Sequence, residues 1–269
     1  MSAITPTLPS DKTPPQPTPA RQRIGAGSFA TVFIVHGGPC AYKVIHDTTN
    51  AETLLKEYTM LSSLHLTCNP DSFFALPRPF VFHNPQTNVL TVQPQRSLHR
   101  SPRLTFSAET FSTLGFTAPT YVMDRVFVLP LRISNPIRDL YYPPHAKETN
   151  PPPLCRLYFG KVLDVAPVQT SRPNHFFNSS NFPLDVARYT ALAAHLPLPP
   201  VAEVVEGMGE MLARLHWRGN VDGRDIEFVM GGDGYEGISF FVIDFNQARH
   251  TSSNSAVLSV CLLTVIPRR

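Results

Sequence analysis

Proline limits where this chain can form regular structure. Of its 28 prolines, six lie in residues 1–20, and residues 143–153 read PPHAKETNPPP. Because proline fixes φ and lacks a backbone donor, neither stretch can continue a helix or a central strand. Residues 1–20 also carry almost no large apolar side chains, which predicts a disordered arm. Residues 143–153 predict a linker or a long surface loop.

Composition predicts a globular protein without an extended basic surface. With 269 residues, 42% of them hydrophobic, the chain is long enough to bury a core as one domain or two lobes. The net charge of +3 is too small for this length to indicate a nucleic-acid partner. We interpret the densest basic cluster as a solvated loop, and its members are Arg96, His99, Arg100 and Arg103.

Cysteine spacing and hydropathy narrow the class of protein further. The cysteines are Cys40, Cys68, Cys155 and Cys261, and none belongs to a C-x-x-C pair. This spacing indicates neither a zinc site nor a disulfide framework, and it fits a reducing compartment. No apolar run reaches the roughly 18 residues that span a bilayer, and the first residues do not resemble a secretory signal. We therefore expect a soluble protein of the cytoplasm or the nucleus, with no membrane contact.

The first apolar-rich stretch, IGAGSFATVFIVHGGPCAYKVI at residues 24–45, is typical of strands joined by glycine turns. Lys43 lies inside its last apolar run. By strand alternation, the lysine either points outward to water or faces a cleft that holds an anionic partner. Thr49 and Glu52 have the spacing of a capping box, which predicts a helix after residue 49. Glu57 falls on the apolar stripe of that helix, so it either reaches water at the stripe edge or meets Lys43.

These elements resemble the N-terminal lobe of a protein kinase. The segment Gly25-x-Gly27-x-x-Ala30-x-Val32 is similar to the kinase glycine loop, Ala41-Tyr42-Lys43 to the A-x-K strand, and Glu57 to the helix glutamate. The resemblance implies that the turn covers ATP phosphates while Lys43 contacts them and Glu57 orients the lysine. Ala30 replaces the third glycine of the family pattern and adds a Cβ where the phosphates would approach.

The segment TYVMDRV at residues 120–126 resembles the strand that leads into the kinase hinge. The resemblance places Met123 at the back of an adenine pocket, with backbone groups of Asp124 and Val126 bound to the base. An ordinary core strand is the alternative. With the glycine-loop and strand positions, the expected nucleotide-binding set is Gly25, Gly27, Ala30, Val32, Ala41, Met123, Asp124 and Val126.

The C-terminal half repeats the order of elements around a kinase catalytic site. Apolar residues recur at helical spacing over residues 201–217, where we expect His216 and Trp217 to pack. An aspartate loop, a predicted hairpin over residues 226–243 and Asp244-Phe245-Asn246 follow. By resemblance to H-R-D, Asp222 would accept the proton of the substrate hydroxyl, which makes Asp222, Lys43 and Glu57 the expected catalytic residues.

The metal-binding positions depart from the kinase pattern. By resemblance to D-F-G, Asp244 would bind Mg²⁺ together with Glu227, which stands where kinases have an asparagine. A further carboxylate at this place either binds metal more strongly or raises a pKa by repulsion. A loop with ordinary surface acids is the alternative. The cofactors implied by the resemblance are ATP and Mg²⁺.

Residues 201–249 also resemble a fungal family of uncharacterised kinase-like proteins. Its members carry an L-H-W segment, a D-x-x-D-V-E-F-V segment and a D-F-N-Q-C-R segment, and Ala248 replaces the cysteine of the last one in this chain. Some members are labelled zinc finger proteins, which the cysteine spacing of this chain does not support. The resemblance implies a fold and no established activity.

We therefore expect a two-lobe, protein kinase-like α+β fold with ranges 1–20, 21–127, 128–250 and 251–269. These are a disordered arm, a small antiparallel-sheet N-lobe, a minimal and mainly helical C-lobe, and an atypical tail. We interpret the tail as a shortened C-terminus, with a packed strand or short helix as alternatives. The expected function is nucleotide binding, with phosphotransferase activity or as a degenerate pseudokinase. The alternative is a non-catalytic interaction module with a vestigial cleft, whose proline-rich arm recruits protein partners.

Overall fold

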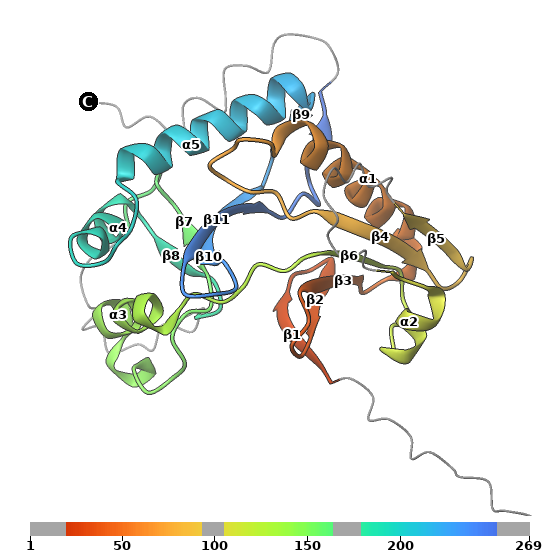
Figure 1. The fold of residues 1–269 in the computed structure, drawn as a ribbon, viewed down its shortest axis with the longest axis horizontal. Helices are drawn as coiled ribbons and strands as arrows, with labels where there is room; N and C mark the ends of the chain where they lie inside the picture. The colour runs from red at the N-terminus through yellow and green to blue at the C-terminus, as the bar shows by residue number, and fades with distance from the viewer. Residues whose placement is uncertain (1–19, 93–104, 164–178, 252–269) are drawn as a thin grey trace, which may run out of the picture.

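The computed structural model of this chain describes residues 20–92, 105–163 and 179–251, and it has a mixed α+β fold (Figure 1). A six-stranded antiparallel sheet has the order β1-β2-β3-β6-β4-β5. Its strands are β1 (Arg21–Ala26), β2 (Ala30–Val35), β3 (Cys40–Ile45), β4 (Pro79–Asn84), β5 (Val89–Val92) and β6 (Thr120–Asp124). Helix α1 (Ala51–Cys68) connects β3 to β4, and the short α2 (Ala108–Thr113) precedes β6.

Both faces of the inner strands β3, β6 and β4 are covered, so these strands are mostly buried, whereas the edge strand β1 is mostly exposed. Successive side chains of a strand point to opposite faces. Ile45 and Tyr121 therefore join the large core that includes α1, whereas Tyr42 and Val122 join a smaller core with Phe111 of α2. Lys43 has the same parity as Ile45. The alternation thus directs its side chain toward α1, and the prediction that it could point outward to water is wrong.

Helix α1 does not begin with the expected capping box. Its N-cap is Asn50, whose side chain makes no cap hydrogen bond. Asp47 instead accepts a hydrogen bond from Thr49 N–H at 2.9 Å, at the start of the 3₁₀ turn η1 (Thr48–Asn50). An aspartate is a strong cap, so the chain turns three residues before the helix proper and leaves Thr49 inside that turn.

The second part of the fold, residues 128–163 and 179–251, contains more β-structure than the sequence predicts. A four-stranded sheet has the order β11-β10-β7-β8, and β7 and β8 are parallel. Its strands are β7 (Cys155–Leu157), β8 (Phe182–Leu184), β10 (Glu227–Gly232) and β11 (Ile238–Ile243). The β10–β11 hairpin is confirmed. Strands β7 and β8 were not predicted, because they are three residues each and too short to show a period.

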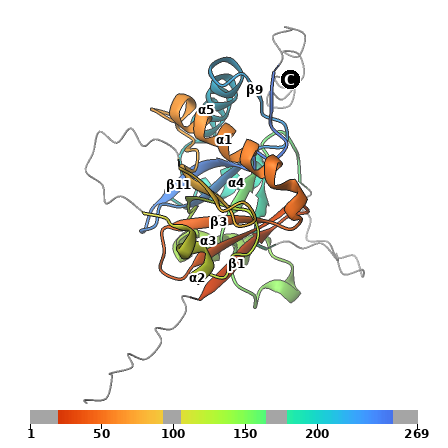
Figure 2. The same ribbon diagram turned by 90° about the vertical axis from the view of Figure 1, so that its right-hand side faces the viewer.

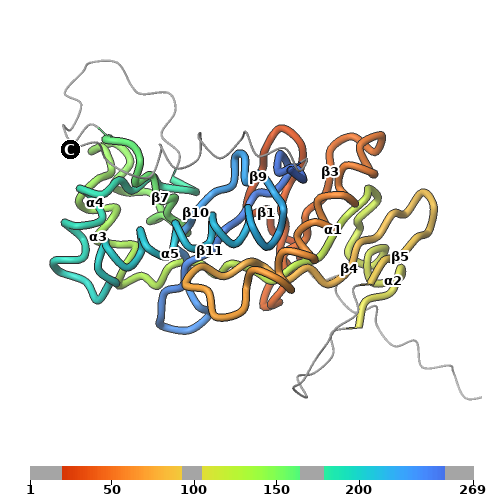
Figure 3. The backbone as a smooth tube through the Cα atoms, turned by 90° about the horizontal axis from the view of Figure 1, so that it is seen from above, coloured from red at the N-terminus to blue at the C-terminus, as the bar shows by residue number. Residues whose placement is uncertain are grey.

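Three helices and a small ribbon complete this part (Figures 1 and 3). The helices are α3 (Leu131–Tyr141), α4 (Val186–Ala193) and α5 (Val201–Ala213), and the ribbon pairs β9 (Val221–Asp222) with β12 (Arg249–His250). Residues 143–153 hold one 3₁₀ turn, η2 (Pro144–Ala146), whose Ala146 is buried. This stretch is therefore partly packed, although proline keeps it free of longer elements.

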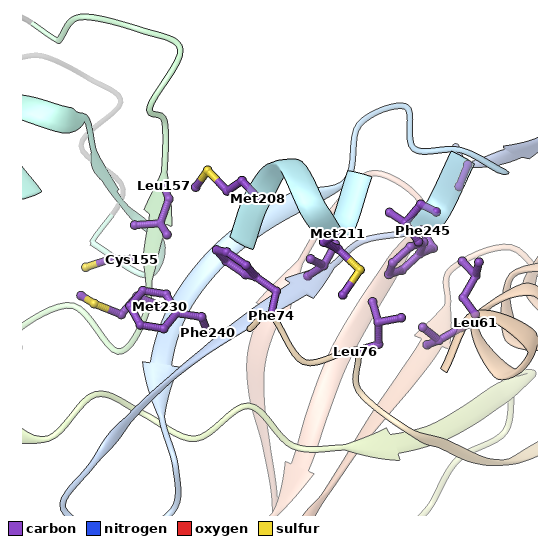
Figure 4. Packing of buried hydrophobic residues seen from close by; sticks show 14 of the residues in the cluster. Leu61, Phe74, Leu76, Cys155, Leu157, Met208, Met211, Met230, Phe240 and Phe245 are labelled. Carbon is purple, nitrogen blue, oxygen red and sulfur yellow. The ribbon is translucent and has the colours of Figure 1, made fainter. Parts of the chain in front are cut away.

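One core connects the two parts. Figure 4 shows residues from the loop after α1, from α5 and from the β10–β11 hairpin packed together. Ala75 N–H donates to Phe240 O at 2.8 Å, and Val242 N–H donates to Ala75 O at 3.0 Å. The loop between α1 and β4 thus extends the second sheet by an isolated bridge at Ala75. This fixes the end of β11 relative to α1.

The predicted helix over residues 201–217 is confirmed as α5, but its regular α-helical part ends at Ala213. Val204, Met208 and Met211 are buried, and the helix continues as a wider π turn, η3 (Arg214–Arg218). Figure 2 shows α1 and α5 at the same end of the molecule, where Arg214 donates to Cys68 O at 3.0 Å. Trp217 is 65% exposed, so the expectation that it packs is wrong. Trp217 follows the buried Leu215 by two positions, which is the opposite side of a helix with 3.6 residues per turn.

Three expectations fall outside the described residues. They concern the proline-rich arm, the basic cluster Arg96, His99, Arg100 and Arg103, and the tail after residue 251. Within the described ranges, no helix has both the length and the apolar character that crossing a membrane requires. The three cysteines that the structure describes, Cys40, Cys68 and Cys155, are free thiols and buried.

Candidate functional site

Strand pairing sets three side chains in a row across the sheet. Lys43 of β3 lies opposite Val32 of β2 on one side and opposite Tyr121 of β6 on the other. Directly paired residues present their side chains on the same face of a sheet. Val32, Lys43 and Tyr121 therefore share the face that α1 covers, and Glu57 lies on the buried side of α1.

Lys43, Glu57 and Tyr121 form a buried polar group. Lys43 Nζ lies 2.6 Å from Glu57 Oε1, and the side chains are 10% and 3% exposed. Tyr121 donates its hydroxyl proton to the same oxygen at 3.0 Å. Burial, and then the charge of Glu57, raises the pKa of Tyr121 well above its ordinary value, so the hydroxyl keeps the proton that it donates. The expected Lys43–Glu57 ion pair is confirmed.

Asp244 contacts Lys43 from the second part of the fold. Its Oδ1 lies 3.6 Å from Lys43 Nζ, and its side chain is 40% exposed. Asp244 directly follows β11 and has a φ of 64°, in the left-handed region that costs a residue other than glycine strain. The turn at Asp244 aims its carboxylate back at the lysine. One ammonium group thus joins carboxylates from α1 and from the end of β11.

The turn between β1 and β2 is held by a histidine beneath it. His46 Nδ1 lies 3.1 Å from Ser28 O, and Nε2 lies 2.8 Å from Thr31 Oγ1. A carbonyl only accepts, so Nδ1 carries the proton that it donates. Gly27 N–H also donates to Ala30 O at 2.9 Å and closes the turn. The glycine turn therefore has a defined shape before any ligand binds.

A cleft of about 1470 Å³ lies between this turn and the second part of the fold. All the residues that the sequence assigns to nucleotide binding line it, from Gly25 and Gly27 to Asp124 and Val126. Lys43, Asp244 and Glu227 line it as well. The volume exceeds the usual range for small-molecule pockets, so a nucleotide would fill only part of it.

The chain after β6 is held in an extended form at the cleft. Asp124 N–H donates to Arg78 O at 2.9 Å, and Arg125 N–H donates to Pro39 O at 3.0 Å. The amide proton of Asp124 is thus already engaged, which leaves its carbonyl and the Val126 N–H for the base contacts that the resemblance assigns. Met123 is partly buried against the core behind them.

Glu227 is held by two partners on the opposite wall of the cleft. Its Oε1 lies 2.5 Å from Arg156 Nη1, and its Oε2 accepts from Asn181 Nδ2 at 3.0 Å. Burial raises the pKa of Glu227, and Arg156 opposes that shift, while Asp244 adds to it. The negative charge of Asp244 thus disfavours the ionised form of Glu227. Both oxygens of Glu227 nevertheless have a protein partner.

Asp222, the expected proton acceptor, lies apart from this group. It pairs with Arg249 in the β9–β12 ribbon, and it is not among the residues that line the cleft. Within the described part of the chain, no three His, Cys, Asp or Glu side chains gather in a way that could hold a metal ion. The structure thus brings Lys43, Glu57 and Asp244 together, and it leaves Asp222 outside.

Three residues of the site were not found in the sequence. They are Tyr121, Arg156 and Asn181. The register of β6 against β3 would have pointed to Tyr121, because a residue opposite Lys43 must share its face. Arg156 and Asn181 come from short strands and a loop far from Glu227 in the sequence, so no local pattern signals them. No protein-family model matches this chain, and no curated protein matches it.

Proposed function

We propose that this chain is a kinase-like nucleotide-binding protein and that residues 21–127 and 128–250 correspond to the two lobes of that fold. The observation that carries the proposal is the Lys43–Glu57 pair, buried on a cleft wall beneath a glycine turn. A buried ion pair is weak evidence for stability, because apolar residues of similar volume usually serve as well. Its position at a large cleft favours a role in binding an anion.

The order of elements around the cleft supports a nucleotide as that anion. Helix α1 follows β3 and precedes β4 in the chain, and the end of β6 with the chain after it borders the same cleft as Lys43. Val32, Ala41 and Met123 offer apolar contacts for a base, and the Val126 N–H offers a donor. Lys43 and the backbone of Gly25 and Gly27 would hold the phosphates.

The proposal concerns binding and does not extend to phosphoryl transfer. Transfer to a hydroxyl group needs a base near the end of the triphosphate. Asp222, the residue that the sequence suggests for this role, lies in the β9–β12 ribbon, where its backbone is in register with Arg249, and it is not among the residues that line the cleft. A degenerate kinase-like protein that only binds its ligand would keep the Lys43–Glu57 pair, and it would not need Asp222 at the cleft.

A variant that blocks the cleft without unfolding the chain tests the proposal. A Cβ at Gly25 would meet only Val32 Cβ, at 3.9 Å, so Gly25→Leu should fold and extend into the cleft. We expect the fluorescent analogue mant-ATP to bind the wild-type protein and to bind Gly25→Leu at least about tenfold more weakly. Equilibrium titration by fluorescence anisotropy measures both.

The matched control is Gly209→Leu on α5. A Cβ at Gly209 has no neighbour within 4 Å, and the residue lies outside the cleft lining. This variant should bind like the wild type. If mant-ATP binds none of the three proteins, or binds all three equally, the nucleotide site is elsewhere or absent. The alternative function, a non-catalytic interaction module with a vestigial cleft, would then be the better interpretation.

A further inference from the structure

The backbone brings Arg156 and Glu227 together on one face of the second sheet. Arg156 of β7 is paired with Val229 of β10. Glu227 is two residues from Val229, so it lies on the same face as Val229 and diagonally across from Arg156. A long arginine side chain spans that diagonal, which explains the 2.5 Å contact. The pair is therefore set by strand register.

Two further contacts hold this pair in place. The Arg156 guanidinium lies over the ring of Tyr158 at 4.6 Å from its centroid, and Asn181 Nδ2 occupies the second oxygen of Glu227. The side chains of Arg156 and Glu227 are 29% and 17% exposed. A planar guanidinium fixed on an aromatic face loses less freedom on pairing than a lysine does. Arg156 is thus a pre-positioned cation inside the cleft.

The carboxylates that the resemblance assigns to Mg²⁺ therefore do not fit a divalent ion. Glu227 has Arg156 and Asn181 on its two oxygens, and Asp244 has Lys43 at 3.6 Å. Mg²⁺ needs carboxylate oxygens that face it, in near-octahedral geometry, and it is repelled by nearby cations. Each acidic side chain at this place already has a cationic side chain beside it.

We infer that Arg156 acts, together with Lys43, as a resident cation of the cleft. It neutralises Glu227 where a divalent metal ion would otherwise be needed, so the cleft takes its anionic ligand without Mg²⁺. The second half of this inference rests on the proposed nucleotide binding, whereas the first half concerns Arg156 and Glu227 alone. The ligand class is a nucleotide whose phosphates contact Lys43 and the Arg156 guanidinium directly.

Manganese alone tests the first half without any nucleotide. Calorimetric titration of the wild-type protein with Mn²⁺ should give no binding heat, because Lys43 and Arg156 already pair with Asp244 and Glu227. The variant Arg156→Gln frees Glu227 Oε1 and should gain a Mn²⁺ site with a Kd below about 1 mM. Stoichiometric binding of Mn²⁺ to the wild-type protein overturns the inference whether or not any variant folds.

Three variants make the metal test specific. Arg156→Lys keeps the positive charge and should exclude Mn²⁺ as the wild type does. The double variant Arg156→Gln/Glu227→Gln removes the freed carboxylate and should lose the gained site. Arg138→Gln is the matched control, because it removes an arginine that pairs with the exposed carboxylate of Asp139 outside the cleft lining. A gain of Mn²⁺ binding in Arg138→Gln would contradict a role specific to Arg156.

Nucleotide titration tests the second half. The Kd of the wild-type protein for mant-ATP should differ less than about threefold between buffer with EDTA and buffer with Mg²⁺. Binding at least tenfold tighter with Mg²⁺ overturns metal-independent binding. Arg156→Gln should weaken mant-ATP binding in EDTA by about tenfold, and added Mg²⁺ should restore part of the lost affinity. If no nucleotide binds in either buffer, the proposed function and this second half fail together, while the Mn²⁺ result still decides the role of Arg156.

Discussion

Two ion pairs lie at the cleft, Lys43–Glu57 and Arg156–Glu227. They differ in burial and in how far apart their residues are in the sequence. Lys43 and Glu57 are 10% and 3% exposed, whereas Arg156 and Glu227 are 29% and 17% exposed. The first pair joins a strand to the helix that follows it. The second joins strands that are distant in sequence. We therefore expect the stability of the protein to depend strongly on the Lys43–Glu57 pair. The Arg156–Glu227 pair should mainly set the charge of the cleft.

The largest expected effect comes from removing the buried carboxylate. Glu57→Ala leaves Lys43 buried with only the partly exposed Asp244 as an anionic partner, so we expect a loss of about 3–5 kcal/mol in the free energy of unfolding. Arg156→Ala breaks a partly exposed pair and should lose about 1 kcal/mol. Urea denaturation followed by circular dichroism measures both.

A double variant separates the charge from the packing. Lys43→Met/Glu57→Leu replaces the pair with apolar side chains of similar size. It should recover the part of the stability loss that comes from the unpaired lysine, while the Tyr121 hydroxyl stays without its acceptor. Equal losses in the free energy of unfolding for Glu57→Ala and Arg156→Ala would show that the difference in burial does not make the Lys43–Glu57 pair more important for stability.

An intermediate effect tests whether the two parts of the fold unfold as one unit. Gly207 of α5 faces Phe73 from the loop after α1, and a Cβ there would lie 2.7 Å from Phe73 Cδ1. Gly207→Ala should therefore lose about 1–3 kcal/mol by overpacking. The control Gly209→Ala has no neighbour within 4 Å and should gain about 0.5–1 kcal/mol from helix propensity. A loss confined to one of two unfolding transitions would contradict a shared core.

The smallest expected effect is a difference in pH response. Burial lowers the pKa of His65 on α1 below its ordinary value of 6.5. Its contribution to stability is therefore full above about pH 6.5 and is lost as the pH falls through the folded pKa. Burial raises the pKa of Glu227 above 4.5, so its contribution is full below about pH 4.5 and is lost as the pH rises through the folded pKa.

Variants assign these opposite slopes to His65 and Glu227. His65→Gln should lose less stability than the wild type between pH 7 and pH 5.5, with a residual loss from His83, whose pKa burial also lowers. Glu227→Gln should remove the decline that begins above pH 4.5. Denaturation midpoints measured from pH 4 to pH 8 compare them. Parallel curves for all three proteins would argue against both assignments.

Sequence reasoning succeeded where the contacts follow from local periodicity. The alternation of β3 and the helical stripe of α1 allowed the Lys43–Glu57 pair as one of two alternatives, and the resemblance to a protein kinase favoured it. The α5 helix and the β10–β11 hairpin also have clear periods, and the mixed α+β class follows from them. The partners of Glu227 could not be predicted, because strand register in three-residue strands is set by tertiary packing. The exposure of Trp217 could have been predicted, because helical spacing places it on the side opposite the buried Met211 and Leu215.

Trp217 is the one tryptophan in the sequence, and its side chain is 65% exposed at the end of α5. Indole emission depends on the polarity around the ring, so the folded protein should already emit near the wavelength of indole in water. Loss of the core would therefore change this fluorescence little. Near-ultraviolet circular dichroism of the buried tyrosines Tyr58, Tyr121 and Tyr189 reports on the core instead. The tryptophan itself is a spectroscopic probe for anything that covers the end of α5.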